Sequence, residues 1–499
     1  MDAYRQLETH YKTIADFEHA SGILHWDNAV MMPPGSAAAR AEALATLAVH
    51  LHDLNTDQRI PEWLERAAGE PLDEWQAANL REIRHCYLMN TAVPADLVQA
   101  LSRASSRAEH AWRELRMENN WRDFEPHLET VFSLARQQGQ ALAEALGTDP
   151  YDALLAIYQT GITCSEIDPI FADLAEFLPP VISGALRRQQ AAGDLPPVQE
   201  GIGVERQRAL VLSVTEALGY DFNRGRIDTA HHPFCGGATG DTRITTRYHE
   251  NDFLHSLLAA IHETGHALYE QNRPGAYLGQ PVGHAMGMAV HESQSLFMEK
   301  QVARHPAFIR HLAPLIRQHL APESDSLDER WSAQYLGRLV SRVQPGLIRV
   351  DADECTYPLH IILRYEMEKS LVQGSMVVAD VPDAWDAGMQ RLLGLSTKGD
   401  YRNGCMQDVH WPSGGIGYFP TYTLGAIMAA QLMAAMSADL GDLEERLERG
   451  DLSPIKAWLA EKIWSQGSRF ELQELLQRAT GKPLDAGDFK AHILSRYGR

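Results

Sequence analysis

The residues most suited to chemistry lie in the stretch HSLLAAIHETGHALYEQ, at positions 255–271. Two histidines, His262 and His266, stand four positions apart, with Glu263 directly after the first. Each residue of an α-helix advances by about 100°, so both imidazoles would point to one side of a helix. This pattern predicts a metal site in which the histidines are ligands and Glu263 is the general base. The alternative is an amphipathic helix that carries two surface histidines.

A third ligand is needed because catalytic zinc usually takes three protein ligands and leaves one position open. The following segment, 284–300, offers Glu292 at the margin of an apolar helical surface. A carboxylate is costly to bury there unless a positive charge such as a metal ion compensates it. We therefore expect Glu292 to complete the set, although a salt-bridged helix residue is the alternative. His291 points about 100° away and is expected to support the site from outside the ligand set.

The ligand set His262, His266 and Glu292 predicts zinc, and it would also accept Co²⁺ or Mn²⁺. A helical scaffold that holds zinc only for structure is a competing interpretation. Structural zinc, however, normally takes four ligands, often cysteines, and no open position. The five cysteines are widely spaced and form no CxxC pair, which favours reduced thiols over a disulfide framework or a cysteine metal site.

Helices must position these residues, because apolar side chains recur at intervals of three and four along most of the chain. TRITTRYHE, at 242–250, is the best candidate for a strand, being β-branched and preceded by a turn signal. We expect an all-α protein with at most a small β-sheet. The predicted helices are 2–24, 37–53, 73–89, 95–119, 126–146, 168–192, 204–218, 252–271, 285–303, 307–320, 328–344, 358–374, 421–439 and 453–465.

The net charge of −21 argues against a nucleic-acid partner and against an anionic membrane surface, since both attract clustered Lys and Arg. The first residues lack the apolar region of a signal peptide. The most apolar stretch, LGAIMAAQLMAAM, is about a dozen residues long and is expected to be too short to span a bilayer. Together these features predict a cytoplasmic protein.

With HETGH at 262–266 and HESQS at 291–295, the chain closely resembles the carboxypeptidase Taq family of zinc metallocarboxypeptidases. The matching motifs run in order from about residue 26 into the C-terminal third, and none departs in a way that removes a catalytic group. The other matching stretches are WDNAVMMPPGSAAAR (26–40), HPF (232–234), DTRIT (241–245), IRVDAD (348–353) and GCMQDVHW (404–411).

The resemblance implies one helical catalytic domain over residues 1–499, with its active-site core at about 230–425. It implies two helical lobes around a deep groove, as in neurolysin and angiotensin-converting enzyme, which are also helical HExxH peptidases. The implied activity is removal of single C-terminal residues from peptides with a free C-terminus, with broad specificity. Homodimers are common in the family. An oligopeptide endopeptidase with the same zinc chemistry is the alternative, and it would differ in whether the groove is blocked beyond the scissile bond.

The segment DVHWPSGGIGYFPTYTLG supplies candidates that would stabilise the oxyanion of amide hydrolysis. His410 and Tyr422 are expected to be catalytic and Tyr418 to bind substrate, by likeness to related helical peptidases. Local packing is the alternative for each of them. Asp408 is a candidate for orienting His410 or a ligand histidine.

The resemblance also points to three residues for substrate binding. Arg349 would recognise the C-terminal carboxylate, because a guanidinium can form two parallel charge-assisted hydrogen bonds with it. Arg243 would help to close the far end of the groove, and His232 is a site residue without a clear role. Either arginine could instead pair with an aspartate of its own motif, Asp351 or Asp353 for Arg349 and Asp241 for Arg243.

Overall fold

The computed structural model describes residues 2–197, 200–325 and 328–498. Helices dominate, and the only sheet of the described residues has three short strands, so the expected all-α class is confirmed. In the first half the helices are α1 (Ala3–Val30), α2 (Ala37–Asn55), α3 (Ile60–Ala67), α4 (Glu74–Thr91), α5 (Ala95–Met117), α6 (Trp121–Leu146), α7 (Pro150–Leu155), α8 (Cys164–Ala191), α9 (Val204–Leu218) and α10 (Phe253–Gln271). In the second half they are α11 (Met288–Leu296), α12 (Pro306–Leu320), α13 (Ala333–Val340), α14 (Tyr357–Gln373), α15 (Val381–Leu393), α16 (Pro420–Leu440), α17 (Leu443–Arg449), α18 (Ser453–Lys462), α19 (Leu472–Thr480) and α20 (Gly487–Tyr497).

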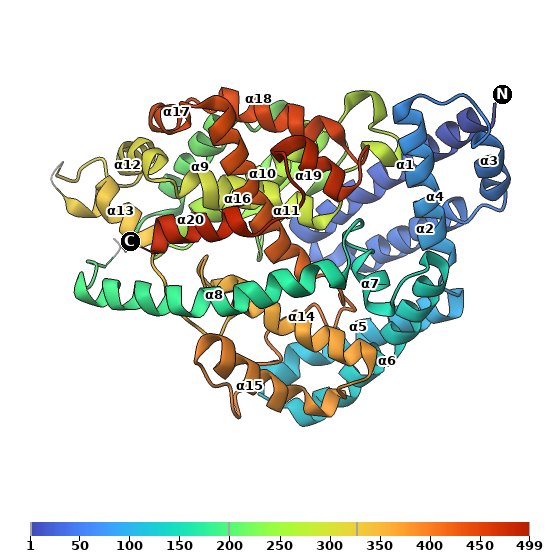
Figure 1. Cartoon of the computed structure of the whole chain (residues 1–499), viewed down its shortest axis with the longest axis horizontal. Coiled ribbons are helices and arrows are strands. Elements are labelled where there is room, and N and C mark those ends of the chain that lie inside the picture. Colours follow the sequence, from blue (N-terminus) through green and yellow to red (C-terminus); the bar gives the residue numbers. More distant parts are fainter. Residues whose placement is uncertain (1, 198–199, 326–327, 499) are drawn as a thin grey trace.

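The N-terminal helices and a group of helices from the second half of the chain lie at opposite ends of the molecule. Figure 1 shows α1 to α4 gathered at one end of the molecule, with α12, α13 and α17 at the opposite end. Helices α10, α11 and α16 lie between them, and the long α8 crosses the molecule beside α14. The predicted ligands belong to α10 and α11, so the candidate site lies among these central helices.

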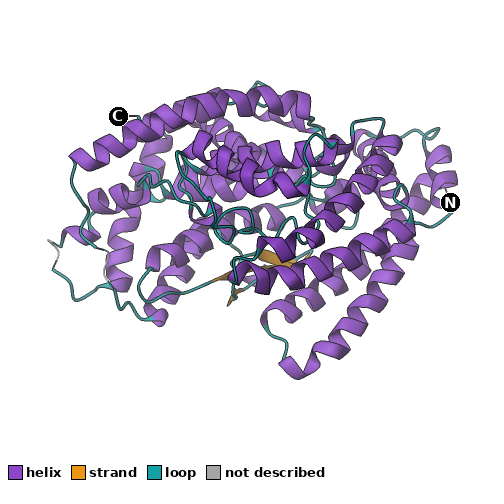
Figure 2. Ribbon diagram, turned by 90° about the horizontal axis from the view of Figure 1, so that it is seen from below, coloured by secondary structure: helices purple, strands orange, loops and turns teal. Residues whose placement is uncertain are grey.

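The small sheet has the strand order β1–β3–β2 and lies among the helices, as Figure 2 shows. Strand β1 (Ile227–Thr229) is parallel to β3 (Asp241–Thr246), and β2 (Cys235–Ala238) is antiparallel to it. The strand predicted at 242–250 is thus real but ends at Thr246, because the polar residues that follow leave the sheet and turn toward α10.

The segment predicted as one helix at 285–303 is interrupted. It begins at Met288 as α11 and continues from Phe297 to Ala303 as a π-helical segment. A π-helix makes hydrogen bonds from residue i to i+5, is rare, and occurs frequently at functional sites.

Buried apolar side chains of the described residues form one large core and three smaller clusters, one of which we call the smaller core. Helix α16 is apolar nearly all round, as expected of a helix enclosed by others, and both α14 and α16 contribute many side chains to the large core. The smaller core lies under α1, α3 and α4. Its buried members are Ala3, Tyr4, Leu7, Tyr11, Ile14, Ile60, Leu64, Ala67, Leu80 and Ile83.

Two helices of the described residues, α8 and α16, are long and apolar enough in composition to cross a bilayer. The expectation that the apolar run near residue 430 is too short was wrong about its length, because α16 extends from Pro420 to Leu440. Most of its apolar window is buried inside the protein, so the packing of a core helix accounts for that composition.

Candidate active site

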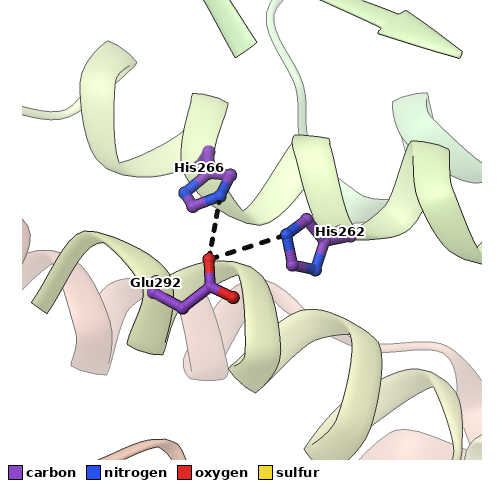
Figure 3. Close-up of side chains that lie close together, drawn as sticks. All are labelled: His262, His266 and Glu292. Carbon is purple, nitrogen blue, oxygen red and sulfur yellow. Dashed lines mark ion pairs between the residues drawn. The ribbon is translucent and has the colours of Figure 1, made fainter. Parts of the chain in front are cut away.

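His262, His266 and Glu292 converge between α10 and α11, as Figure 3 shows. One carboxylate oxygen, Oε2 of Glu292, lies 3.3 Å from Nε2 of His266 and 3.7 Å from Nε2 of His262. One potential ligand atom from each residue lies within 4.8 Å of those of the other two. The two histidines come from successive turns of one helix, so the spacing of HETGH produces the convergence directly.

The other ring nitrogen of each histidine is held by a hydrogen bond. Nδ1 of His262 lies 3.0 Å from Oε2 of Glu299, and Nδ1 of His266 lies 3.1 Å from the backbone oxygen of His291. Acceptors at Nδ1 fix the tautomer that leaves Nε2 free to bind a metal. The imidazole of His291 also lies against that of His266 and is held by Glu270 through its Nε2 at 3.1 Å.

Sequence reasoning missed Glu299, which lies in the π-helical segment Phe297–Ala303. Its second oxygen, Oε1, accepts from Lys300 at 2.7 Å and from Arg304 at 2.6 Å. These two cations hold the pKa of Glu299 well below its ordinary value in spite of burial, so the carboxylate is ionised. Its position seven residues after Glu292, two helical turns, was the available signal.

Two glycines allow the helices to approach closely enough for the site to form. A Cβ at Gly265, inside HETGH, would lie 2.4 Å from the backbone oxygen of Gln294 and 2.6 Å from Cα of Ser295. A Cβ at Gly425 of α16 would lie 2.9 Å from the side chain of Glu292. Glu292 is therefore held between two helices that contact it at close range.

Glu263 is only 6% exposed and lies beside the two histidines on α10. Burial raises the pKa of its carboxyl to about 7, partly offset by His262. A carboxylate with a pKa near neutral is suited to accept a proton and to release it again.

The electrostatics of the cluster fit a divalent cation. Burial lowers the pKa of His262, but the facing carboxylates of Glu292 and Glu299 outweigh burial and raise it to about 9. Burial and the neighbouring His291 lower the pKa of His266 to about 4. Two carboxylates thus face His262, and the three converging donors of the cluster are the nitrogen and oxygen ligands that zinc binds. The residues present therefore fit a divalent metal.

A second group lies at the start of α16 and in the loop before it. Nε2 of His410 lies 3.2 Å from the hydroxyl of Tyr422, and the Tyr418 ring contacts both residues. Burial raises the pKa of Tyr418 and Tyr422, and Glu292 contributes to both shifts, which places the two phenols near the metal cluster. Burial lowers the pKa of His410 to about 4, so its imidazole is neutral.

Arg349 pairs with Asp408, which is not one of the aspartates of its own motif. Its Nε and one terminal nitrogen each lie 2.8 Å from Oδ1 of Asp408, and its other terminal nitrogen donates to Tyr357 at 2.9 Å. Asp353 instead accepts backbone hydrogen bonds at the start of α14. The other oxygen of Asp408 accepts from Arg364, which is completely buried. Asp408 therefore orients two arginines and, among the contacts of the described residues, forms no hydrogen bond with His410.

Arg243 and His232 lie on the small sheet. Arg243 forms a two-point contact with Asp241, at 2.9 and 2.5 Å, and its guanidinium stacks on Trp26. His232 is exposed, and its backbone oxygen accepts from Thr245. The pairing left open for Arg243 is thus present, and no contact joins Arg243 or His232 to the described cluster around His410.

A mainly helical fold that buries a His-His-Glu cluster beside a second glutamate defines the class of HExxH metallopeptidases. Comparison with known proteins gives the family. The model of the carboxypeptidase Taq (M32) metallopeptidases matches residues 6–497. Thermostable carboxypeptidase 1 of Thermus thermophilus is 40% identical over 511 residues, which cover 99% of this chain and 98% of that protein.

Solved structures agree with this match over the whole chain. Metallocarboxypeptidase 1 of Trypanosoma cruzi superposes with a TM-score of 0.97 at 38% identity, covering 100% of this chain and 99% of the other. An M32 carboxypeptidase from Deinococcus radiodurans gives 0.93 at 35% identity, covering 99% of each. The chain belongs to the carboxypeptidase Taq (M32) family and is a metallocarboxypeptidase, a hydrolase of peptide bonds.

Proposed function

We propose that this metallocarboxypeptidase releases single amino acids from the free C-terminus of peptides with broad specificity, and that His262, His266 and Glu292 bind a zinc ion for that reaction. The convergence of their ligand atoms within 4.8 Å carries the proposal. Co²⁺ and Mn²⁺ suit the same donors. We also propose a cytoplasmic location, from the charge and the N-terminal sequence, and a homodimer, from the family resemblance; both stay predictions.

Zinc bound there would polarise the scissile carbonyl and acidify a water molecule. Glu263 accepts the proton of the attacking water and donates it to the nitrogen of the departing amino acid. Burial suits this carboxylate to both steps, because a pKa of about 7 lets it take up and release a proton near neutral pH. Glu299 and the backbone of His291 keep the two imidazoles oriented throughout.

His410 and Tyr422 stabilise the oxyanion that forms when the carbonyl is attacked. The neutral imidazole and the phenol lie 3.2 Å apart, so a donor from either can face the same point. Tyr418 lines the same region, and its ring packs edge-on against Tyr422. In this assignment the tyrosines act as hydrogen-bond donors, since burial keeps them protonated.

The C-terminal carboxylate of the substrate is recognised by the positive charge around Arg349. Arg349 and Arg364 share the single carboxylate of Asp408, so two cations face one anion and a net positive charge remains. Arg349 is 6% exposed and stacks on Tyr422, which brings that charge beside the oxyanion donors. Arg243 and His232 are assigned to the groove wall, at a distance from the reacting bond.

The reaction class is tested by mass spectrometry of an unblocked peptide over time, with and without a chelator. We expect successive loss of C-terminal residues that stops on chelation and resumes when zinc is added back. Cleavage that continues in the metal-free protein would contradict the proposal.

The endopeptidase alternative is tested with a peptide amidated at its C-terminus. A carboxypeptidase that depends on the terminal carboxylate should leave this peptide intact, whereas an endopeptidase should cut it. Arg349→Ala should slow cleavage of the free-acid peptide and so narrow the ratio of its cleavage rate to the residual rate on the amidated peptide. An unchanged ratio would remove Arg349 from this role.

A further inference from the structure

The loop that carries His410 and Tyr418 is fastened to α14 by one buried carboxylate, that of Glu368. Its Oε1 accepts from Nε1 of Trp411 at 2.8 Å, and its Oε2 accepts from the backbone nitrogen of Gly417 at 3.0 Å. Trp411 directly follows His410, and Gly417 directly precedes Tyr418. The carboxylate therefore holds the loop at the two positions next to its proposed functional residues.

Glu368 is completely buried, and a third donor, the hydroxyl of Tyr151, reaches its Oε2 at 2.7 Å. Burial of a carboxyl group is unfavourable unless its oxygens are hydrogen-bonded. Three donors from two separate segments satisfy this one group, so the loop and α7 are both tied to α14. Removal of the acceptor would leave three buried donors without a partner.

The backbone of the loop at Gly417 also packs closely against α7, on the side away from Glu368. Gly417 has a φ of +92°, and a Cβ there would lie 2.8 Å from the backbone of Leu154 at the end of α7. The loop is thus held between Leu154 and Glu368. One turn earlier on α14, Arg364 binds Asp408, two residues before His410. The same helix face therefore fastens the loop at three points.

We propose that Glu368 is a positioning residue for the hydrolytic reaction. It sets the places of His410 and Tyr418 through Trp411 and Gly417, without touching the substrate. This inference rests on the proposed function, because the proposed function assigns His410 and Tyr418 their roles. A displacement of about 1 Å in such groups can lower a rate roughly 100-fold.

The test compares Glu368→Gln with Glu354→Gln. Glu354 is a matched control, since it is also buried and accepts from three side chains, but they belong to α20 and not to the loop. Its donors are His492 at 2.8 Å, Arg496 at 2.9 Å and Tyr497 at 2.8 Å. Both variants should lose thermal stability. Glu368→Gln should lower kcat by about 10- to 100-fold with little change in KM and with full metal content, whereas Glu354→Gln should leave kcat of the folded protein unchanged.

A second measurement repeats Glu368→Gln in a His410→Ala, Tyr418→Phe background. If Glu368 acts through these residues, its substitution should cost little further activity there. An equal loss in both backgrounds, or an unchanged kcat in the single variant, would overturn the inference and leave the proposed function intact. If His410→Ala and Tyr418→Phe do not lower kcat, the assignment of the loop in the proposed function fails, and this inference fails with it.

Discussion

The two ring nitrogens of each histidine in the metal cluster have different roles: one faces the proposed metal position, and the other is hydrogen-bonded. Nε2 faces Glu292, and Nδ1 faces an acceptor that belongs to another part of the chain. HETGH predicted the first role, because helix geometry fixes it locally. The second role depends on where Glu299 lies after the chain has folded, and the local motif does not specify that position.

The role of Glu263 separates proton transfer from metal binding. Glu263→Gln keeps the size of the side chain and is not at a ligand position, so metal content should stay unchanged. The loss of the general base should lower kcat by roughly 10²- to 10⁴-fold. Elemental analysis and peptide hydrolysis measure the two quantities, with Glu366→Gln on the surface of α14 as the control. Metal lost in proportion to activity would count against the role.

Glu299 should affect metal affinity in a way that other buried carboxylates do not. Glu299→Gln removes the charged acceptor at Nδ1 of His262, and such changes typically weaken metal binding by about 10- to 100-fold. Competition with a chelating dye measures the affinity. Glu354→Gln is the control, because Glu354 also lies near Arg304 but contacts neither ligand histidine. Equal weakening in both variants would indicate a general effect of charge.

At the scale of elements, all the long helices and a few of the short ones were predicted from the sequence, whereas most short helices were not. The prediction of 252–271 differs from α10 by one residue, since apolar periodicity and Asp252 as N-cap mark it clearly. Helices α3, α7, α15, α17, α19 and α20 were not predicted. They span 6 to 13 residues, and a periodic pattern needs more turns than most of them provide.

The contact between α10 and α11 makes Gly265 sensitive to any added side chain. Gly265→Ala should push against Gln294 and Ser295, lower the free energy of unfolding by about 1–3 kcal/mol and weaken metal binding. Thermal denaturation and chelator competition measure both effects. Gly337→Ala in α13 is the matched control, because a Cβ there has no neighbour within 4 Å and alanine favours helix. Normal metal affinity in Gly265→Ala would contradict this view of the helix contact.

At the scale of the whole molecule, the periodicity of apolar residues predicted the class of fold, but the long-range ion pairs became visible only in the structure. The sequence offered Asp351 and Asp353 as partners of Arg349, because they are neighbours in the chain. The actual partner, Asp408, lies 59 positions away and also binds Arg364. Sequence patterns record local geometry, whereas such pairs depend on how distant helices pack.

The buried imidazole of His360, which lies near Arg364 and Asp408, should make the free energy of unfolding depend on pH. Burial and the adjacent Arg364 lower the pKa of His360 to about 3, from an ordinary value of 6.5. The folded protein therefore disfavours a proton that the unfolded chain accepts. This contribution to stability is complete above pH 6.5 and is lost as the pH falls toward 3.

His360→Gln removes that titration, so its unfolding free energy should fall less steeply than that of the unsubstituted protein between pH 6.5 and 4. Denaturant unfolding at a series of pH values measures the slopes. Parallel slopes for the two proteins would show that His360 does not keep a lowered pKa in the fold.

The small core under α1, α3 and α4 has a consequence for how the protein opens. A cluster with its own buried side chains, such as Tyr4, Leu7 and Ile83, can unfold as a separate cooperative unit at a lower free energy than the rest. Amide hydrogens of these helices should then exchange with deuterium earlier than those of α16, even under native conditions. If these N-terminal helices unfold while the catalytic centre stays folded, proteolysis should begin in this N-terminal region.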